Sequence, residues 1–232
     1  MPDTKLLTES RDGVLTLTLN RPEKLNAIDN DLSRNLLQAL HAAAADESVR
    51  VIRLRANGRA FCAGRDVSAS PTEDDLVLVQ AVAEAIVRHP KLVLAQVHGW
   101  TVGAGFEWML DADVVVAAAS TRFKLPEASL GVFVTGGLSA TLAATVGLGR
   151  AKALTLFGDV FTAHQALDWG MVWKVADDSD LEEASWNAAM KLATLKPNVA
   201  TQFKRVFNLI GLAAFDRAIQ EENMAQRVLG PQ

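Results

Sequence analysis

The hydrophobic pattern of the first half of the chain changes repeatedly between two periods. Residues 14–19 alternate leucine with threonine, which predicts a half-buried strand, and residues 51–56 alternate in a similar way. Between them, apolar residues at helical spacing predict an amphipathic helix over residues 30–45. Two short apolar runs, at 93–97 and 114–119, indicate buried strands. The N-terminal two thirds of the chain is therefore expected to repeat strand and helix, and the C-terminal third to be helical.

The remaining pattern is mainly helical. Thr72 is expected to cap a helix that reaches about Arg88, because Pro90 stops it. A short strand is expected at 172–175, and the other predicted helices cover residues 136–146, 150–157, 162–169, 181–195, 199–210 and 213–228. These elements predict the α/β or α+β class. We expect one core domain over residues 1–175, followed by a helical region over residues 176–232.

Composition limits the possible classes and cellular locations of the protein. Half of the 232 residues are apolar, which is enough for a large core. The formal net charge of −4 and the lack of long basic runs argue against a nucleic-acid or anionic-membrane surface. No apolar run approaches the roughly 20 residues needed to cross a bilayer. The single cysteine and the polar N-terminal stretch favour a cytoplasmic protein without a signal peptide.

The candidate chemistry is concentrated between His98 and Glu127. A strand is followed by the small-residue turn 103–105, and a helix carrying Glu107 begins there. Bare backbone in such a turn lets a ligand approach the N–H groups, and the positive end of the helix points at the same place. Glutamates on both sides of the turn could move protons beside a developing oxyanion.

Two other interpretations fit the turn alone. A glycine pair after a strand, with an acid about 20 residues further on, is also part of the dinucleotide-binding pattern. Here Trp108 occupies the position of the third glycine, which that pattern needs for close helix–strand packing. The turn could also be a tight turn that binds no ligand.

A second small-residue loop covers residues 61–66. Its small side chains could approach a ligand closely, with Arg65 offering an N–H, although an ordinary surface loop explains the same residues. Cys62 is expected to be a buried, inert thiol. The four histidines show no metal-ligand spacing, so no metal site is expected, and only His98 borders the candidate site. The acidic run 73–75 is most simply a solvated helix start.

Four blocks of sequence follow one another over nearly the whole chain: 21–27 (RPEKLNA), 60–66 (AFCAGRD), 99–107 (GWTVGAGFE) and 123–131 (FKLPEASLG). In this order and spacing they resemble the crotonase family, the enoyl-CoA hydratase/isomerase superfamily. The resemblance implies a spiral of strand–strand–helix repeats with C-terminal helices used for trimer assembly. It also implies an acyl-CoA thioester as ligand and a homotrimer, or a hexamer made of two trimers.

The family's functional residues can be carried onto this chain. The resemblance implies that the backbone N–H groups of Arg65 and Ala104 hold the thioester oxygen. It implies that Glu107 activates water and that Glu127 exchanges the α-proton. The residues expected to bind CoA or substrate are Lys24, Leu25, Ala27, Ala63, Asp66, Val67 and Gly103. No separate cofactor is expected, because coenzyme A is part of the substrate.

The activity implied in this way is hydration of a 2-enoyl-CoA, as in fatty-acid β-oxidation. The alternatives are a Δ3–Δ2 enoyl-CoA isomerase, or other enolate chemistry on a CoA thioester, at the same site. A third is a non-catalytic RNA-binding protein of the same fold, against which the acidic net charge and the two glutamates argue. The pocket walls are expected around residues 69–80, Trp100 and residues 132–135.

The chain departs from the family pattern at three points. A proline–glycine-rich turn is usual after Gly131, but residues 132–137 read VFVTGG, so the acyl group is expected to be unusual. Thr135 stands where some relatives place a functional carboxylate, which makes their chemistries less expected here. The sequence ends at Gln232, where relatives usually continue, so assembly and the binding of the nucleotide end are open.

Overall fold

The computed structural model describes residues 4–68 and 73–229, and its main element is a six-stranded sheet. The strand order is β1-β2-β3-β5-β7-β10. Only β1 runs antiparallel to its neighbour, and the other pairs are parallel. The strands are β1 (Leu6–Arg11), β2 (Val14–Leu19), β3 (Val51–Ala56), β5 (Leu92–Val97), β7 (Val114–Ala118) and β10 (Lys174–Ala176).

A smaller sheet lies beyond the ends of three of these strands. Its order is β4-β6-β8-β9, and β4, β6 and β8 follow β3, β5 and β7 directly along the chain. These strands are β4 (Ala60–Cys62), β6 (Trp100–Val102), β8 (Arg122–Lys124) and β9 (Phe161–Thr162). These three turns of the chain therefore each contribute one strand to the larger sheet and one to the smaller sheet, and a helix follows. This arrangement confirms the predicted spiral of strand–strand–helix repeats.

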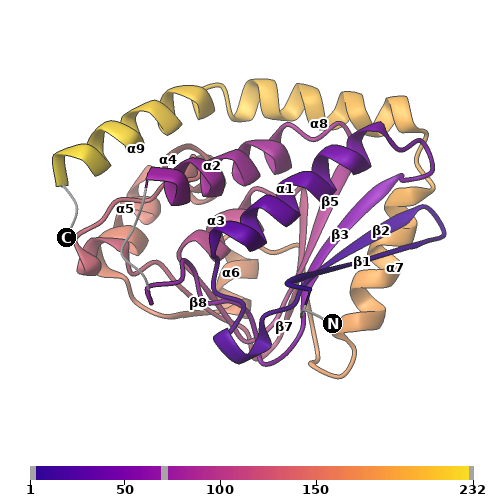
Figure 1. Ribbon diagram of the computed structural model, residues 1–232, viewed down its shortest axis with the longest axis horizontal. Coiled ribbons are helices and arrows are strands. Elements are labelled where there is room, and N and C mark those ends of the chain that lie inside the picture. The colour runs from indigo at the N-terminus through magenta and orange to yellow at the C-terminus, as the bar shows by residue number, and fades with distance from the viewer. Residues whose placement is uncertain (1–3, 69–72, 230–232) are drawn as a thin grey trace.

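The helices α1 and α2 lie over one face of the larger sheet (Figure 1). The helix α1 begins as predicted, because Asp29 caps it by accepting a 2.8 Å hydrogen bond from the N–H of Leu32. The helices are α1 (Asn30–Ala45), α2 (Glu73–Val87), α3 (Ala104–Leu110), α4 (Leu138–Val146), α5 (Leu148–Phe157) and α6 (Ala163–Asp168). Two short 3-10 helices are η1 (Pro22–Lys24) and η2 (Glu127–Leu130). The expected cap at Thr72 lies outside the described residues.

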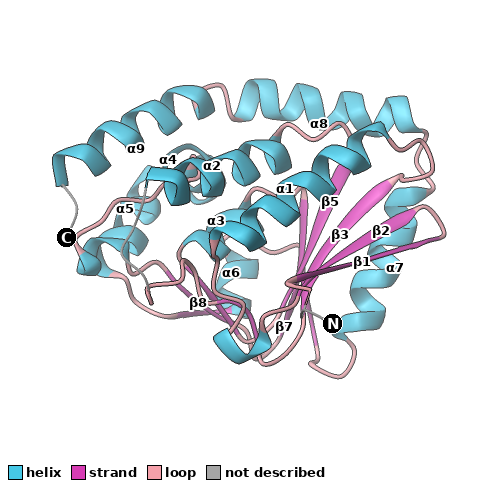
Figure 2. Ribbon diagram, in the orientation of Figure 1, coloured by secondary structure: helices cyan, strands magenta, loops and turns pink. Residues whose placement is uncertain are grey.

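The other face of the larger sheet is covered by α7 (Leu181–Ala193), which Figure 2 shows on the side opposite α1. Val14, Val51 and Leu94 pack there against Leu181. The prediction that residues 14–19 form a half-buried strand is therefore wrong. Its threonine face is buried as well, because a helix from the C-terminal region lies over it.

Two long helices end the described chain, α8 (Pro197–Gly211) and α9 (Phe215–Leu229). They run along one side of the molecule, above α1 and α2 in the view of Figure 1. Lys204 anchors α8: its ammonium lies 2.8 Å from Asp113 Oδ2 and donates to the carbonyl oxygen of Ile86. Phe203, Phe207 and Ile210 of α8 remain exposed. The division into a domain at 1–175 and a helical region at 176–232 stays a prediction.

Candidate active site

Two loops expected to bind CoA are joined to each other by backbone hydrogen bonds. The N–H of Ala63 donates to the carbonyl of Leu25 at 3.0 Å, and the N–H of Ile28 donates to that of Gly64 at 2.8 Å. Leu25 has φ of 52° and Asn26 has φ of 54°, a left-handed turn that reverses the first loop. The two loops therefore form one surface.

An ion pair strengthens the same junction. Arg21 Nη2 lies 3.1 Å from Asp66 Oδ2, and the N–H of Ser68 donates to Asp66 Oδ1 at 3.0 Å. These hydrogen bonds from Ser68, together with Arg21, lower the pKa of Asp66 to about 2. Lys24 and Val67 are exposed beside it. The structure gathers on this surface the residues Lys24, Leu25, Ala27, Ala63, Asp66 and Val67, and their contact with a ligand stays a prediction.

The turn at Gly103 lies against the second of these loops. A Cβ atom on Gly103, whose φ is +52°, would stand 4.0 Å from the Cα of Gly64. A Cβ on Gly64 would stand 3.8 Å from the backbone nitrogen of Ala104. Ala104 is the first residue of α3, so its N–H has no acceptor within its own helix. The backbone of Gly64, which precedes Arg65, and that of Ala104 are thus neighbours, and the role of the two N–H groups stays a prediction.

Close packing behind the turn explains Gly105 and Cys62. A Cβ on Gly105 would stand 2.5 Å from the Cβ of Cys62, so only glycine fits. The Cys62 thiol is fully buried and donates to the carbonyl of Asn26 at 3.1 Å. Burial raises the pKa of this thiol to about 12. The cysteine is a packing residue.

We expect the Cys62 thiol to resist alkylation by iodoacetamide at neutral pH in the native protein and to react at once in denaturant. The reason is that the reactive form is the thiolate, which is both disfavoured and inaccessible here. Mass measurement after timed labelling tests this. Rapid labelling of the native protein would contradict the buried assignment.

Glu107 lies in the first turns of α3, with 1% of its surface exposed. Its carboxylate accepts hydrogen bonds from the N–H of Thr135 at 3.1 Å, the Thr135 hydroxyl at 3.1 Å and the N–H of Gly136 at 2.7 Å. Burial, and then the charges of Glu127 and Glu222, raise the pKa of Glu107 to about 8. Glu107 is therefore fixed in position by hydrogen bonds and can still bind a proton near neutral pH.

Glu127 begins η2 directly opposite the turn. Its Oε1 atom would lie 2.8 Å from a Cβ on Gly103, so the carboxyl group presses against the bare backbone there. Its Oε2 atom is buried, and no described residue donates a hydrogen bond to it. Burial raises the pKa of Glu127 to about 7. The structure thus brings together the turn and both predicted glutamates.

Two further buried acids were not among the site residues predicted from the sequence. Glu222 of α9 accepts hydrogen bonds from the backbone N–H groups of Gly137 and Ser139, both at 2.8 Å. Asp111 follows Glu107 by one helical turn, and within the described part of the chain neither of its oxygens receives a hydrogen bond. Burial raises the pKa of both acids. The spacing of Asp111 on the helix was visible in the sequence, but nothing local marked Glu222.

Other residues considered from the sequence lie elsewhere or have another partner. His98 Nε2 lies 2.8 Å from the carbonyl oxygen of Gly58, in a pocket lined by neither glutamate. Asp75 is not simply solvated, because its carboxylate lies 2.9 Å from Arg65 Nη2. Trp100 is 43% exposed on β6. Of the expected pocket wall at 69–80, residues 69–72 lie outside the described residues.

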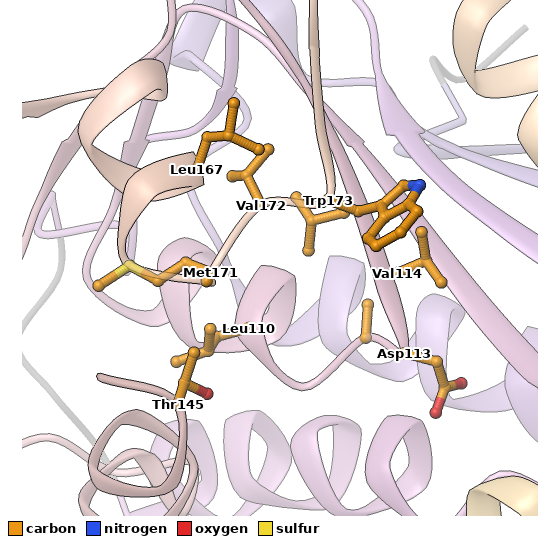
Figure 3. Close-up of a pocket in the computed structure, with 11 residues that line it drawn as sticks. Leu110, Asp113, Val114, Thr145, Leu167, Met171, Val172 and Trp173 are labelled. Atoms are coloured by element: carbon orange, nitrogen blue, oxygen red, sulfur yellow. The ribbon is translucent and has the colours of Figure 1, made fainter. Parts of the chain in front are cut away.

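A cavity of about 520 Å³ lies at the other end of α3 (Figure 3). Leu110, Thr145 and Met171 line it, with Trp173 at its edge. None of the predicted site residues lines this cavity. In residues 4–68 and 73–229, no group of three or more His, Cys, Asp or Glu side chains is arranged to hold a metal ion. None of the helices in those ranges has the length and apolar character that a membrane crossing needs.

The comparisons with known proteins show the family and support the fold. The sequence model of the enoyl-CoA hydratase/isomerase family matches residues 9–228. The chain belongs to this family. Membership supports an enzyme with activity of the enoyl-CoA hydratase/isomerase type, as the sequence resemblance had predicted.

Relatives within the enoyl-CoA hydratase/isomerase family include both kinds of enzyme. The 1,2-epoxyphenylacetyl-CoA isomerase of Escherichia coli is 33% identical, over 97% of this chain and 90% of its own length. The 2,3-dehydroadipyl-CoA hydratase of Escherichia coli is 34% identical, over 84% of this chain and 78% of its own. The crystal structure of an enoyl-CoA hydratase from Mycobacterium avium subsp. paratuberculosis superposes with a TM-score of 0.92 at 30% identity, covering 98% and 91% of the two chains.

Proposed function

We propose that this protein is an enoyl-CoA hydratase, which adds water across the double bond of a 2-enoyl-CoA. The observation that carries the proposal is the pair of buried carboxyl groups, Glu107 and Glu127, on either side of the Gly103 turn. Hydration needs one group that takes a proton from water and another that gives a proton to carbon. The pair can supply both.

The turn supplies the remaining requirement, a site for negative charge. When water attacks the β-carbon, the electrons of the double bond move to the thioester oxygen as an enolate. The backbone N–H groups of Arg65 and Ala104 are proposed to donate to this oxygen, at the positive end of α3. Their neighbouring backbones and the bare Gly103 support this proposal.

Hydrogen bonding supports different roles for the two acids. Three donors from Thr135 and Gly136 stabilise the charged form of Glu107, whereas no described donor reaches Glu127 Oε2. Because the pKa of Glu107, about 8, lies above that of Glu127, about 7, the state with one proton carries it mainly on Glu107. The less populated form, with the proton on Glu127 and the charge of Glu107 stabilised by its three donors, is proposed to be the reactive one. Glu107 then takes a proton from water as the C–O bond forms, and Glu127 gives its proton to the α-carbon. After product formation Glu107 releases its new proton to solvent and Glu127 takes one up, which restores the starting state.

The joined loops are proposed to hold the rest of the substrate. Lys24 and Val67 are exposed at the surface formed by both loops, where they could contact the nucleotide end of CoA. Ala27 and Ala63 are small and could allow the pantetheine chain to approach the backbone. No separate cofactor is proposed, because every proton and electron pair in hydration comes from water, the acids or the substrate.

The pH profile of kcat/KM for hydration is expected to be bell-shaped. The two carboxyl groups lose their protons in two steps that belong to the pair, near pH values of about 7 and about 8. Below the first value both are protonated and no base remains, and above the second both are ionised and no acid remains. Initial rates across this range measure the profile. A rate that stays flat through both values would contradict the shared proton.

The proposed function is tested with purified protein and two substrates, a 2-enoyl-CoA and the matching 3-enoyl-CoA. Hydration of the first removes its conjugated absorbance and yields a 3-hydroxyacyl-CoA, which mass analysis identifies by the gain of one water. We expect this reaction to dominate. Conversion of the 3-enoyl-CoA to the 2-enoyl-CoA without hydration would instead assign the protein as an isomerase.

The isomerase is kept as a second candidate because one relative that covers nearly the whole chain is an isomerase by name. Isomerisation between 3-enoyl and 2-enoyl forms needs only one carboxylate that moves a proton between two carbons. Glu127 alone could do this. The presence of a second held carboxylate at Glu107 favours hydration.

A homotrimer, or a hexamer of two trimers, is proposed as the assembly. The apolar side chains of Phe203, Phe207 and Ile210 are exposed on α8, each at 63% or more. Exposed apolar groups of this size on one helix are typical of an interface. Light scattering after size-exclusion chromatography gives the mass directly, and a monomer at micromolar concentration would contradict the proposal.

A further inference from the structure

The position of Glu107 depends on a segment that follows η2 and includes the first two residues of α4. This segment, residues 133–139, supplies all three hydrogen bonds that the Glu107 carboxylate accepts from described residues, through Thr135 and Gly136. A carboxylate held by backbone N–H groups is only as well placed as that backbone. Whatever fixes residues 133–139 therefore also fixes Glu107.

Glu222 holds the far half of this segment. Its Oε2 accepts from the N–H of Gly137 at 2.8 Å, and its Oε1 accepts from the N–H of Ser139 at 2.8 Å and from the Ser139 hydroxyl at 2.6 Å. Only 1% of Glu222 is exposed. The segment thus donates hydrogen bonds to two carboxylates, those of Glu107 in α3 and Glu222 in α9. Gly136 and Gly137, which bond to the two different acids, are adjacent in the chain.

Gln226 and Phe215 of α9 also contact this segment, and Asn223 of α9 reaches it through Gln80 of α2. The Gln226 side chain accepts from the N–H of Phe133 at 2.8 Å. Asn223 accepts a 2.6 Å hydrogen bond from Gln80, whose amide also donates to the carbonyl of Thr135.

The ring of Phe215 completes these contacts. A Cβ on Gly137, at φ of +80°, would stand 2.3 Å from Phe215, so this ring packs directly on the backbone of the turn. The helix α9 therefore fixes residues 133–139 along their length.

We propose that Glu222 is a positioning residue for Glu107, acting through residues 133–139. The inference rests on the proposed function, because it takes Glu107 as the group that activates water. Glu222 orders the peptide groups whose N–H donors orient Glu107, and α9 as a whole provides the rigid support. A displacement of about 1 Å in a catalytic group can cost about a hundredfold in rate, so the support has a measurable effect on turnover.

The test compares Glu222→Gln with Glu221→Gln. A glutamine at 222 offers one acceptor oxygen to three donors, and its NH₂ group opposes a backbone N–H. The neighbouring Glu221 is exposed on the same helix, so its variant is a matched control. We expect kcat for hydration to fall by about tenfold to a hundredfold in Glu222→Gln, with KM changed much less. Glu221→Gln should keep the wild-type values.

A double variant separates positioning from general weakening of the fold. If Glu222 acts through Glu107, then Glu222→Gln costs little further rate once Glu107 is already glutamine. An equal loss in both backgrounds would overturn the proposal, and so would wild-type kcat in Glu222→Gln. If Glu222→Gln does not fold, Gln226→Ala removes only the acceptor for Phe133 and should give a smaller loss of the same kind.

Amide hydrogen exchange gives a readout that does not depend on hydratase activity. The N–H groups of Thr135 and Gly136 bond to Glu107, so their exchange reports on that contact. We expect faster exchange of both in Glu222→Gln and unchanged exchange in Glu221→Gln. If the wild-type protein hydrates no enoyl-CoA, the proposed function fails, while the exchange result still decides whether Glu222 supports Glu107. Unchanged exchange in Glu222→Gln overturns the inference.

Discussion

Replacing Glu127 by glutamine is expected to lower kcat for hydration by about 10²–10⁴-fold, the usual contribution of general acid–base catalysis. The carboxyl group of Glu127 lies against Gly103, beside the first residue of α3. The proposed function puts the α-carbon of the bound thioester next to this carboxyl group. An amide fills the same space but cannot give up a proton to carbon. Substrate binding should change little, because the amide keeps the shape of the side chain.

The measurement is kcat and KM for a 2-enoyl-CoA, together with exchange of the α-proton of a saturated acyl-CoA in D₂O. Both reactions should be lost in Glu127→Gln. Glu183→Gln, an exposed position on α7, serves as the control and should match the wild type. Wild-type exchange of the α-proton in Glu127→Gln would show that another group carries out this step.

Glu107→Gln is expected to lower hydration by a similar factor, about 10²–10⁴-fold, but to leave α-proton exchange largely intact. The reason is that Glu107 is assigned to water and Glu127 to carbon. In this variant the donors from Thr135 and Gly136 remain, so the amide oxygen can still be held in place. Only the ability to accept a proton is removed.

This contrast between the two variants distinguishes the candidate functions. In a hydratase, Glu107→Gln separates the two reactions, since exchange continues while hydration stops. In an isomerase that uses only Glu127, Glu107→Gln should leave the main reaction nearly unchanged. Thermal unfolding of each variant against wild type shows whether a lost rate reflects chemistry or folding, and hydration that survives in Glu107→Gln would refute its assignment.

The longer elements could be predicted from the sequence because their signals are local. The helix over residues 30–45 has a regular apolar stripe, and the structure places α1 at the same bounds. The strand β1 was missed because residues 6–11 carry little apolar pattern. Its stability comes from pairing with β2 over its full length. The three-residue strands of the smaller sheet are too short to show a period.

Some residues of the candidate site could likewise be predicted from local sequence, and others could not. Glu107 and Glu127 could be identified because a glycine turn lies between them and each sits close to it in the chain. The roles of Thr135 and Gly136 as donors to Glu107 could not be predicted, because every residue except proline has a backbone N–H and the sequence does not show which of them donate to a side chain. Glu222 looks like any other acid on an amphipathic helix until α9 is packed onto the turn.

The contact between Glu222 and Gly137 joins residues 85 positions apart, which has a consequence for how the protein matures on the ribosome. Synthesis proceeds from the N-terminus, so both glutamates and the turn between them emerge well before α9 does. A nascent chain stalled short of residue 222 would already contain the reactive groups without the support that orients one of them. The proposed hydratase activity is thus acquired only after α9 has been made and has packed onto residues 133–139.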